Sequence, residues 1–151
     1  MEETTLSASE ELIRAVLCAG ETFSFQPYGT SMLPTIHPGR DSVSIRRLDG
    51  RAALYDILLY KRPTGKFVLH RVIAVGKGDY TLCGDNRVEI ERGVKDDWII
   101  GVLTAVHYPS GKTLSRGTKA FEKAGRRALR RYPLRRLCSR LSSLRRRLLG
   151  K

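Results

Sequence analysis

With 151 residues, of which 41% are hydrophobic, the chain is long enough to bury the core of one compact domain and too short for two domains of ordinary size. Its net charge of +13 is uneven, because residues 1–111 hold 13 Lys and Arg against 14 Asp and Glu, whereas residues 112–151 hold 15 against one acid, Glu122. This composition argues against disorder, and a near-neutral body with a basic tail excludes a uniformly basic nucleic-acid-binding domain.

The first predicted element is a short helix within residues 1–20. Ser7 and Glu10 have the spacing of a capping box, which marks a helix N-terminus, and Gly20 is a typical stop. The apolar positions between them recur at helical spacing: Leu12, Ile13, Val16 and Leu17. Because this apolar stripe is narrow, we expect the helix to lie on the domain surface and cover part of it.

Residues 21–115 are predicted to form a sheet of five to eight short strands. Apolar residues alternate with polar ones or form short runs at Phe23 and Phe25, Val43 and Ile45, Ile57 to Tyr60, Phe67 to Val75, Tyr80 to Cys83, Trp98 to Tyr108, and Thr113 and Leu114. Glycine, proline and asparagine turns separate them. Between the first two strands, glycines and prolines break up Tyr28–Gly39 into a loop with Thr30-Ser31 at its centre. The pattern predicts a mostly β, coiled, antiparallel sheet.

Residues 116–151 are predicted to be a basic helical tail, divided by Pro133. Beyond that proline, leucines follow a 3-4-3-4 spacing with arginines at the other positions: Leu134, Leu137, Leu141, Leu144 and Leu148. Such a helix, over residues 118–151, can lie on an anionic membrane surface, bind nucleic acid through phosphates, or pack its leucines on the body or a partner. We favour the first and third interpretations equally and nucleic acid less.

Cysteine usage and hydropathy limit the cofactors and the location. Cys18, Cys83 and Cys138 are odd in number and widely spaced, so we expect no disulfide framework, no metal and no other cofactor. The N-terminus is acidic at Glu2 and Glu3, and no apolar run reaches the ~18 residues of a membrane span. We therefore expect a cytoplasmic or peripheral membrane protein without a transmembrane segment or signal peptide.

Ser31 and His70 are the first two candidates for chemistry. A serine in a glycine- and proline-bounded turn can present its hydroxyl outward and its own N–H to an oxyanion, although a turn serine more commonly caps local backbone. In a strand, His70 shares a face with Val68 and Val72, and partial desolvation there favours the neutral, proton-accepting imidazole. The alternative is a core histidine satisfied by a backbone carbonyl.

Asp85 is the third candidate, in Gly84-Asp85-Asn86. Its carboxylate can orient an imidazole or hold active-site loops in place, but the tripeptide is also an ordinary turn sequence. Other titratable residues compete less well: Lys61 and Lys66 as a lysine base, His37 in the loop, and His107 at a strand end. Arg71 points away from His70 and is expected to pair with Asp56 or another acid.

Taken in order, these segments resemble the S24/S26 peptidase clan, which contains signal peptidase I and the self-cleaving repressors. Its serine box, roughly Gly-x-Ser-Met-x-Pro-Thr, matches Gly29–Thr35. Its next boxes match Asp56–Lys61 and His70–Val72, and its Gly-Asp-Asn box matches Gly84–Asn86, followed by a similar strand at Ile99–Val102. The resemblance covers about residues 20–114.

This resemblance implies a serine endopeptidase of the signal peptidase fold that cleaves a peptide or precursor protein after small residues. Ser31 would be the nucleophile and Asp85 the supporting acid. His70 stands where bacterial signal peptidases carry lysine, as in the archaeal and endoplasmic-reticulum type. The chain departs from the pattern at Tyr55, where the family usually has glycine, and at Arg40, which separates Gly39 from the next acid.

Two alternatives to a peptidase acting on other chains stay open. One is a catalytically silent binding module that keeps the peptidase fold. The other is a self-cleaving regulator, since related repressors cut their own chain at a small-residue pair upstream of the serine. Ala19-Gly20 is such a pair, but it lies close to Ser31 at the end of the predicted helix.

Overall fold

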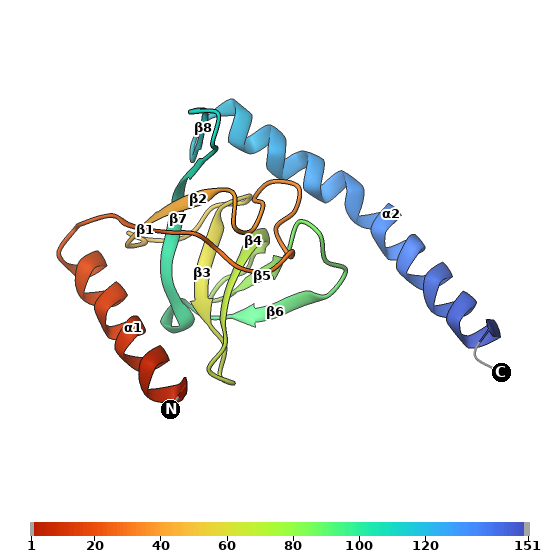
Figure 1. The fold of residues 1–151 in the computed structure, drawn as a ribbon, viewed down its shortest axis with the longest axis horizontal. Helices are drawn as coiled ribbons and strands as arrows, with labels where there is room; N and C mark the ends of the chain where they lie inside the picture. Colours follow the sequence, from red (N-terminus) through yellow and green to blue (C-terminus); the bar gives the residue numbers. More distant parts are fainter. Residues whose placement is uncertain (1, 150–151) are drawn as a thin grey trace.

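The computed structural model describes residues 2–149, and it shows one antiparallel sheet of eight strands with a helix at each end of the chain (Figure 1). In chain order the elements are α1 (Glu2–Cys18), β1 (Phe23–Phe25), β2 (Ser42–Arg46), β3 (Ile57–Lys61), β4 (Phe67–Val75), β5 (Tyr80–Cys83), β6 (Ile90–Val94), the 3-10 helix η1 (Asp96–Trp98), β7 (Ile99–His107), β8 (Thr113–Ser115) and α2 (Lys119–Leu149). The strand order is β1-β2-β7-β3-β4-β5-β6, with β8 also paired to β7. The prediction of a mostly β, antiparallel protein with helical ends is confirmed.

Alternation along the strands divides the buried apolar side chains between two cores. In β3, Ile57 and Leu59 belong to one core, whereas Leu58 and Tyr60 belong to the other. The first core also contains Leu17 from α1 and residues of the loop between β1 and β2. Both the N-terminal helix and this loop are therefore held against the same face of the sheet.

Two helix predictions need correction. The first helix begins at Glu2, so Ser7 lies within it and does not cap it. The second helix is continuous from Lys119 to Leu149, so Pro133 does not divide it. Proline removes one helical hydrogen bond but keeps a helical φ, and Pro133 is exposed, so water can bond the freed carbonyl.

The first half of α2 packs on the sheet domain. Phe121 is 2% exposed and joins the first core, and Gly125 and Ala128 are also buried. Arg116, just before the helix, forms a two-pronged ion pair with the buried Asp56, with both distances 2.7 Å. None of the helices within residues 2–149 combines the length and the apolar character that crossing a bilayer requires.

Candidate active site

Ser31 and His70 line the same pocket, which has a volume of about 410 Å³. One wall comes from the loop after β1 and the other from β4. The lining residues are Pro27, Tyr28, Gly29, Ser31, Met32, Ile36, Arg62, Phe67, Val68, Leu69, His70, Arg87, Glu89 and Glu91. Folding thus brings together two of the three predicted site residues across nearly forty positions of sequence.

The turn that carries Ser31 is held by the Gly84-Asp85-Asn86 turn. The Asn86 N–H donates to the Ser31 carbonyl at 2.8 Å, and the Asn86 side-chain amide donates to the Thr30 carbonyl at 3.2 Å. The Thr35 hydroxyl donates to the Asp85 carboxylate. Within the described residues the Ser31 N–H donates to no acceptor, so this donor is free to bind an oxyanion.

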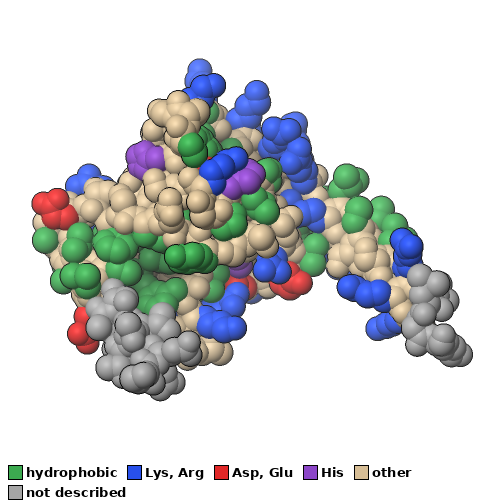
Figure 2. Space-filling model, viewed as in Figure 1, with side chains coloured by type: hydrophobic (Ala, Val, Ile, Leu, Met, Phe, Trp, Pro, Cys, Tyr) green, Lys and Arg blue, Asp and Glu red, His purple; other side chains and the backbone are tan. Residues whose placement is uncertain are grey.

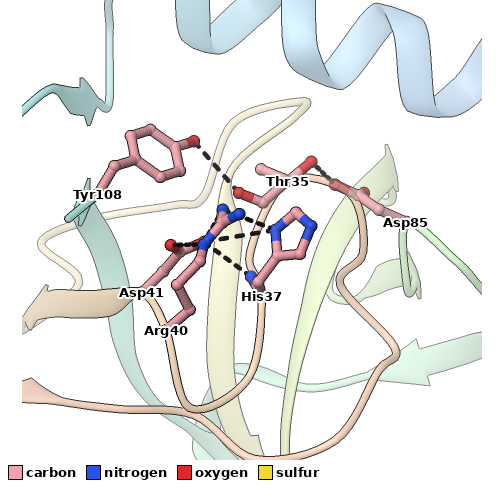
Figure 3. Close-up of polar contacts among 6 residues, drawn as sticks. All are labelled: Thr35, His37, Arg40, Asp41, Asp85 and Tyr108. Atoms are coloured by element: carbon pink, nitrogen blue, oxygen red, sulfur yellow. Dashed lines mark hydrogen bonds and ion pairs between the residues drawn. The ribbon is translucent and has the colours of Figure 1, made fainter. Parts of the chain in front are cut away.

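A second polar cluster fixes the far end of this loop (Figure 3). The buried Asp41 carboxylate accepts the His37 N–H at 2.8 Å and two bonds from the Arg40 guanidinium at 2.7 and 3.0 Å. Burial alone would raise the pKa of Asp41, but these hydrogen bonds outweigh it and hold the pKa below its usual value. The Tyr108 hydroxyl donates to the Thr35 carbonyl at 3.2 Å. The loop is therefore tied down on both sides of the turn.

His70 is 6% exposed and lies opposite Leu58 in the β3–β4 pairing. Val68 and Val72 contribute to the same core face, and Leu69 to the other, so the predicted facing of the strand is confirmed. Burial lowers the pKa of the imidazole below 6.5, and the nearby Glu91 carboxylate offsets part of that effect. His70 is consequently neutral near pH 7.

Glu91 on β6 is the carboxylate that contacts the imidazole. Its Oε1 lies 3.2 Å from His70 Nδ1, and the Tyr60 hydroxyl lies 3.4 Å from the same nitrogen. A neutral imidazole that carries its proton on Nδ1, the nitrogen that faces the Tyr60 hydroxyl and the Glu91 carboxylate, has its lone pair on Nε2. Arg62 in turn binds both Glu91 oxygens, with Nε at 2.9 Å from Oε2.

The electrostatics of this cluster keep Glu91 ionised and Tyr60 protonated. Burial alone would raise the pKa of Glu91, but the Arg62 guanidinium and the Tyr60 hydroxyl together lower it below its usual value. Burial and the Glu91 charge both raise the pKa of Tyr60. Glu91 therefore stays a carboxylate facing an imidazole, an arrangement that stabilises an imidazolium if His70 takes up a proton.

Gly84 lies where the serine turn meets the imidazole. A Cβ at this position would lie 2.7 Å from the Ser31 carbonyl oxygen and 3.1 Å from His70 Nε2. A side chain at this position would therefore collide with the serine turn and crowd His70 Nε2. Among the described residues, no hydrogen bond joins the Ser31 hydroxyl to His70, a contact that commonly tightens only when substrate binds.

Asp85 lies beside the site without touching the imidazole. Its carboxylate accepts two hydrogen bonds from Arg71, at 2.8 and 2.7 Å, and both side chains are 1% exposed. Of its two predicted roles, this geometry corresponds to holding the loops, because Asp85 links Arg71 on β4 to Thr35 in the serine loop. Arg71 also donates to the Tyr55 carbonyl at 2.9 Å.

The departure at Tyr55 has a structural counterpart in α2. Tyr55 has a φ of 75°, in the left-handed region where glycine is favoured. A Cβ on Gly125 would lie 2.7 Å from Tyr55 Cβ and Cγ. Gly125 has no side chain and thus leaves room for Tyr55, the aromatic residue at the position where the S24/S26 pattern usually has glycine.

The competing residues lie elsewhere. Lys61 forms an ion pair with Glu10 of α1 at 2.7 Å, and Lys66 is exposed. His107, at the end of β7, is half-buried and bonds the Ser44 hydroxyl at 2.8 Å. Ala19-Gly20 follows α1 and does not line the Ser31 pocket.

Sulfur and metal chemistry have no assembled site in the described part of the chain. Cys18 and Cys138 are exposed, Cys83 is buried, and all three are free. Within residues 2–149 no three His, Cys, Asp or Glu side chains are grouped closely enough to hold a metal ion.

Sequence reasoning missed Glu91, Tyr60 and Arg62 as parts of the site. Glu91 lies in β6, whose sequence Ile-Glu-Arg-Gly-Val lacks strand alternation, so neither the strand nor its position beside His70 was expected.

A scan against protein-family models finds no match for this chain, and a search of curated proteins finds no significant match.

Proposed function

We propose that the chain is a serine endopeptidase of the S24/S26 type, resembling signal peptidase I, with Ser31 as nucleophile and His70 as general base. The observation that carries this proposal is the meeting of the Ser31 turn and His70 Nε2 over Gly84 in one pocket. The unbonded Ser31 N–H and the Glu91 carboxylate at Nδ1 support it, because a nucleophile, an oxyanion donor and an oriented base then surround one space.

The substrate is a peptide or precursor segment bound as an added strand along β4. This strand pairs with β3 over Phe67–Arg71, but with β5 only from Arg71 onward. Among the described strands, Phe67–His70 therefore has a neighbour on one side only, and this stretch lines the pocket opposite Pro27–Gly29. An extended peptide that hydrogen-bonds to this edge runs past Ser31.

Catalysis begins with attack of the Ser31 hydroxyl oxygen on the substrate carbonyl carbon. His70 Nε2 takes the hydroxyl proton, and the Ser31 N–H binds the developing oxyanion. When the C–N bond breaks, the leaving amine takes the proton from Nε2. Water then attacks the acyl-enzyme with the same imidazole as base, releasing the acid and restoring the hydroxyl of Ser31.

The role of the supporting acid divides between two carboxylates. Glu91 orients the imidazole through Nδ1 and offsets the positive charge of the transient imidazolium. Asp85 acts through Arg71 and Thr35 and so positions the serine turn. This assignment replaces Asp85 by Glu91 as the group beside the base and keeps Asp85 as a positioning residue.

The test is cleavage of an unbiased peptide library, read by mass spectrometry, with variants whose folding is checked by circular dichroism. Ser31→Ala and His70→Ala should each lower cleavage by at least about a thousandfold. The matched controls are Thr30→Ala, a neighbouring hydroxyl, and His37→Ala, a histidine of the same loop; both should cleave at nearly the parent rate. Parent-like cleavage by both site variants would refute the mechanism.

A parent protein that binds library peptides without cleaving any of them would instead support the silent binding module. The same β4 edge would then hold the peptide. If the captured peptides compete with one another for binding, they share one site, which supports the binding module. If they do not compete, the lack of cleavage means only that the library holds no substrate.

A further inference from the structure

The second half of α2 presents three exposed leucines that pack on nothing in the described structure. Leu134, Leu137 and Leu141 are 67%, 55% and 56% exposed. Figure 2 shows hydrophobic side chains among Lys and Arg where this helix extends beyond the sheet domain. The side chains of Leu144 and Leu148, which continue the spacing, lie outside the described residues.

These leucines face away from the sheet domain. Each leucine comes nine positions after a residue that faces the sheet domain. Nine positions are about two and a half helical turns, so each leucine lies on the opposite side of the helix axis. The three pairs are Gly125 and Leu134, Ala128 and Leu137, and Tyr132 and Leu141. Because α2 is continuous, the leucines cannot also pack on the sheet domain. The interpretation of a stripe packed on the body is thereby disfavoured.

The helix is anchored up to the start of this stripe. The Tyr132 hydroxyl donates to the Val88 carbonyl at 3.0 Å, and Arg135 Nε donates to the Arg87 carbonyl at 3.2 Å. Arg87 lines the Ser31 pocket, so the middle of α2 is attached to the wall of the candidate active site. The exposed leucines thus project from a fixed point of the domain.

Positive charge surrounds the stripe. From Lys119 to Leu149 the helix has twelve Lys and Arg and one acid, Glu122, a net charge of +11. Arg140 and Arg145 lie on either side of the leucine line. The outward side of α2 carries basic residues in its first half and leucines in its second half. In order these are Lys119, Lys123, Arg126, Arg130, Leu134, Leu137 and Leu141.

We propose that this face of α2 docks on an anionic lipid bilayer, with Leu134, Leu137 and Leu141 entering the boundary of the acyl region. The arginines, whose long side chains reach outward, bind the headgroup phosphates. A second copy of the helix is the wrong occupant, because the arginines that flank the stripe would face arginines across the pair. Anionic lipid satisfies both the apolar line and the charge.

The test is co-sedimentation of the full chain with vesicles at physiological salt. The two vesicle types are phosphatidylcholine alone and phosphatidylcholine mixed with phosphatidylglycerol. The parent should bind the mixed vesicles at least about tenfold more tightly. The variant L134Q/L137Q/L141Q should bind them at least about a hundredfold more weakly than the parent, since burying the exposed part of each leucine contributes about fivefold or more.

Leu12→Gln, an equally exposed leucine on α1, is the matched control and should bind like the parent. Glutamine keeps helix propensity at exposed positions, so the triple variant should retain its helical signal in circular dichroism. The proposal is overturned if the parent ignores the mixed vesicles. It is equally overturned if the triple variant binds them like the parent, or if short duplex DNA displaces the parent from them while the leucine changes have no effect.

Discussion

At the scale of single residues, the geometry separates two carboxylates that the sequence alone makes hard to tell apart. Asp85 lies in a motif, and Glu91 lies in no motif, yet Glu91 is the one 3.2 Å from His70 Nδ1. Asp85 is instead enclosed by Arg71 and Thr35. The contact with the imidazole and the positioning of the serine loop therefore involve different acids, and each can be changed alone.

Glu91→Gln is expected to lower kcat by at least about tenfold, because an amide can donate to Nδ1 and hold the wrong tautomer. Burial sets the pKa of His70 below 6.5, and the Glu91 charge raises it again in part. Removing that charge should move the acid limb of the kcat/KM profile to still lower pH. Glu89→Gln, another acid lining the pocket, should leave the limb in place. An unchanged limb in Glu91→Gln would contradict the assigned contact.

Gly84→Ala is expected to lower peptide cleavage strongly while the protein still folds. The added methyl would lie 2.7 Å from the Ser31 carbonyl and 3.1 Å from Nε2, so the serine turn or the imidazole must move. Such crowding costs about 1–3 kcal/mol of stability. Gly78→Ala, which meets nothing within 4 Å, is the control for both activity and thermal unfolding. Full activity in Gly84→Ala would show that the two groups do not need to meet there.

At the scale of elements, the buried Arg71–Asp85 pair joins strand β4 to the turn after β5 and, through Thr35, to the serine loop. Asp85→Ala or Arg71→Met should each destabilise the fold by about 3–5 kcal/mol in urea denaturation, because each leaves an uncompensated buried charge. Removing both partners should cost much less than the two single losses together. Strictly additive losses would contradict a direct pair.

Gly125→Ala is expected to destabilise the protein by about 1–3 kcal/mol, although alanine is the better helix former. The reason is the contact with Tyr55, whose Cβ and Cγ lie 2.7 Å from the added atom. Combining it with Tyr55→Gly should recover most of that loss, because the left-handed position then holds glycine and the space is free. Thermal unfolding of the four proteins measures the coupling.

The elements that sequence reasoning predicted are those with a local signature. The long run Phe67–Val75 forms β4. Its alternation correctly predicted that His70 and Leu69 lie on opposite faces of the sheet. β6 was missed because its alternation is broken by charged residues and glycine, and its pairing with β5 is a tertiary contact. The Glu91 contact depends on that pairing, so no local pattern reveals it.

At the scale of the whole molecule, the basic tail is partly a component of the domain. Its first half packs through Phe121 and Gly125, and its middle holds the segment Arg87–Val88 beside the pocket. Charge alone predicted a separate tail, because composition does not reveal which side of a helix is buried. The leucines stay exposed because they lie on the side of the helix opposite the body-facing residues.

The buried, neutral His70 also predicts how global stability depends on pH. Its pKa is lowered on folding, so the unfolded chain takes up a proton near pH 6.5 that the folded chain does not. Stability should therefore be fully present above that pH and fall as the pH drops toward the folded pKa, by at most about 1.4 kcal/mol per pH unit. Urea denaturation of His70→Gln should lose this component. An identical pH slope in parent and variant would contradict it.

The most direct measurement is acid quenching of the parent during turnover of the best library peptide, followed by mass mapping of the enzyme. The proposed chemistry predicts an acyl group of the substrate's N-terminal fragment on the tryptic peptide that contains Ser31. It also predicts no such adduct in Ser31→Ala. Continued cleavage by the parent with the acyl group on another residue, or undiminished cleavage by Ser31→Ala, would contradict the account.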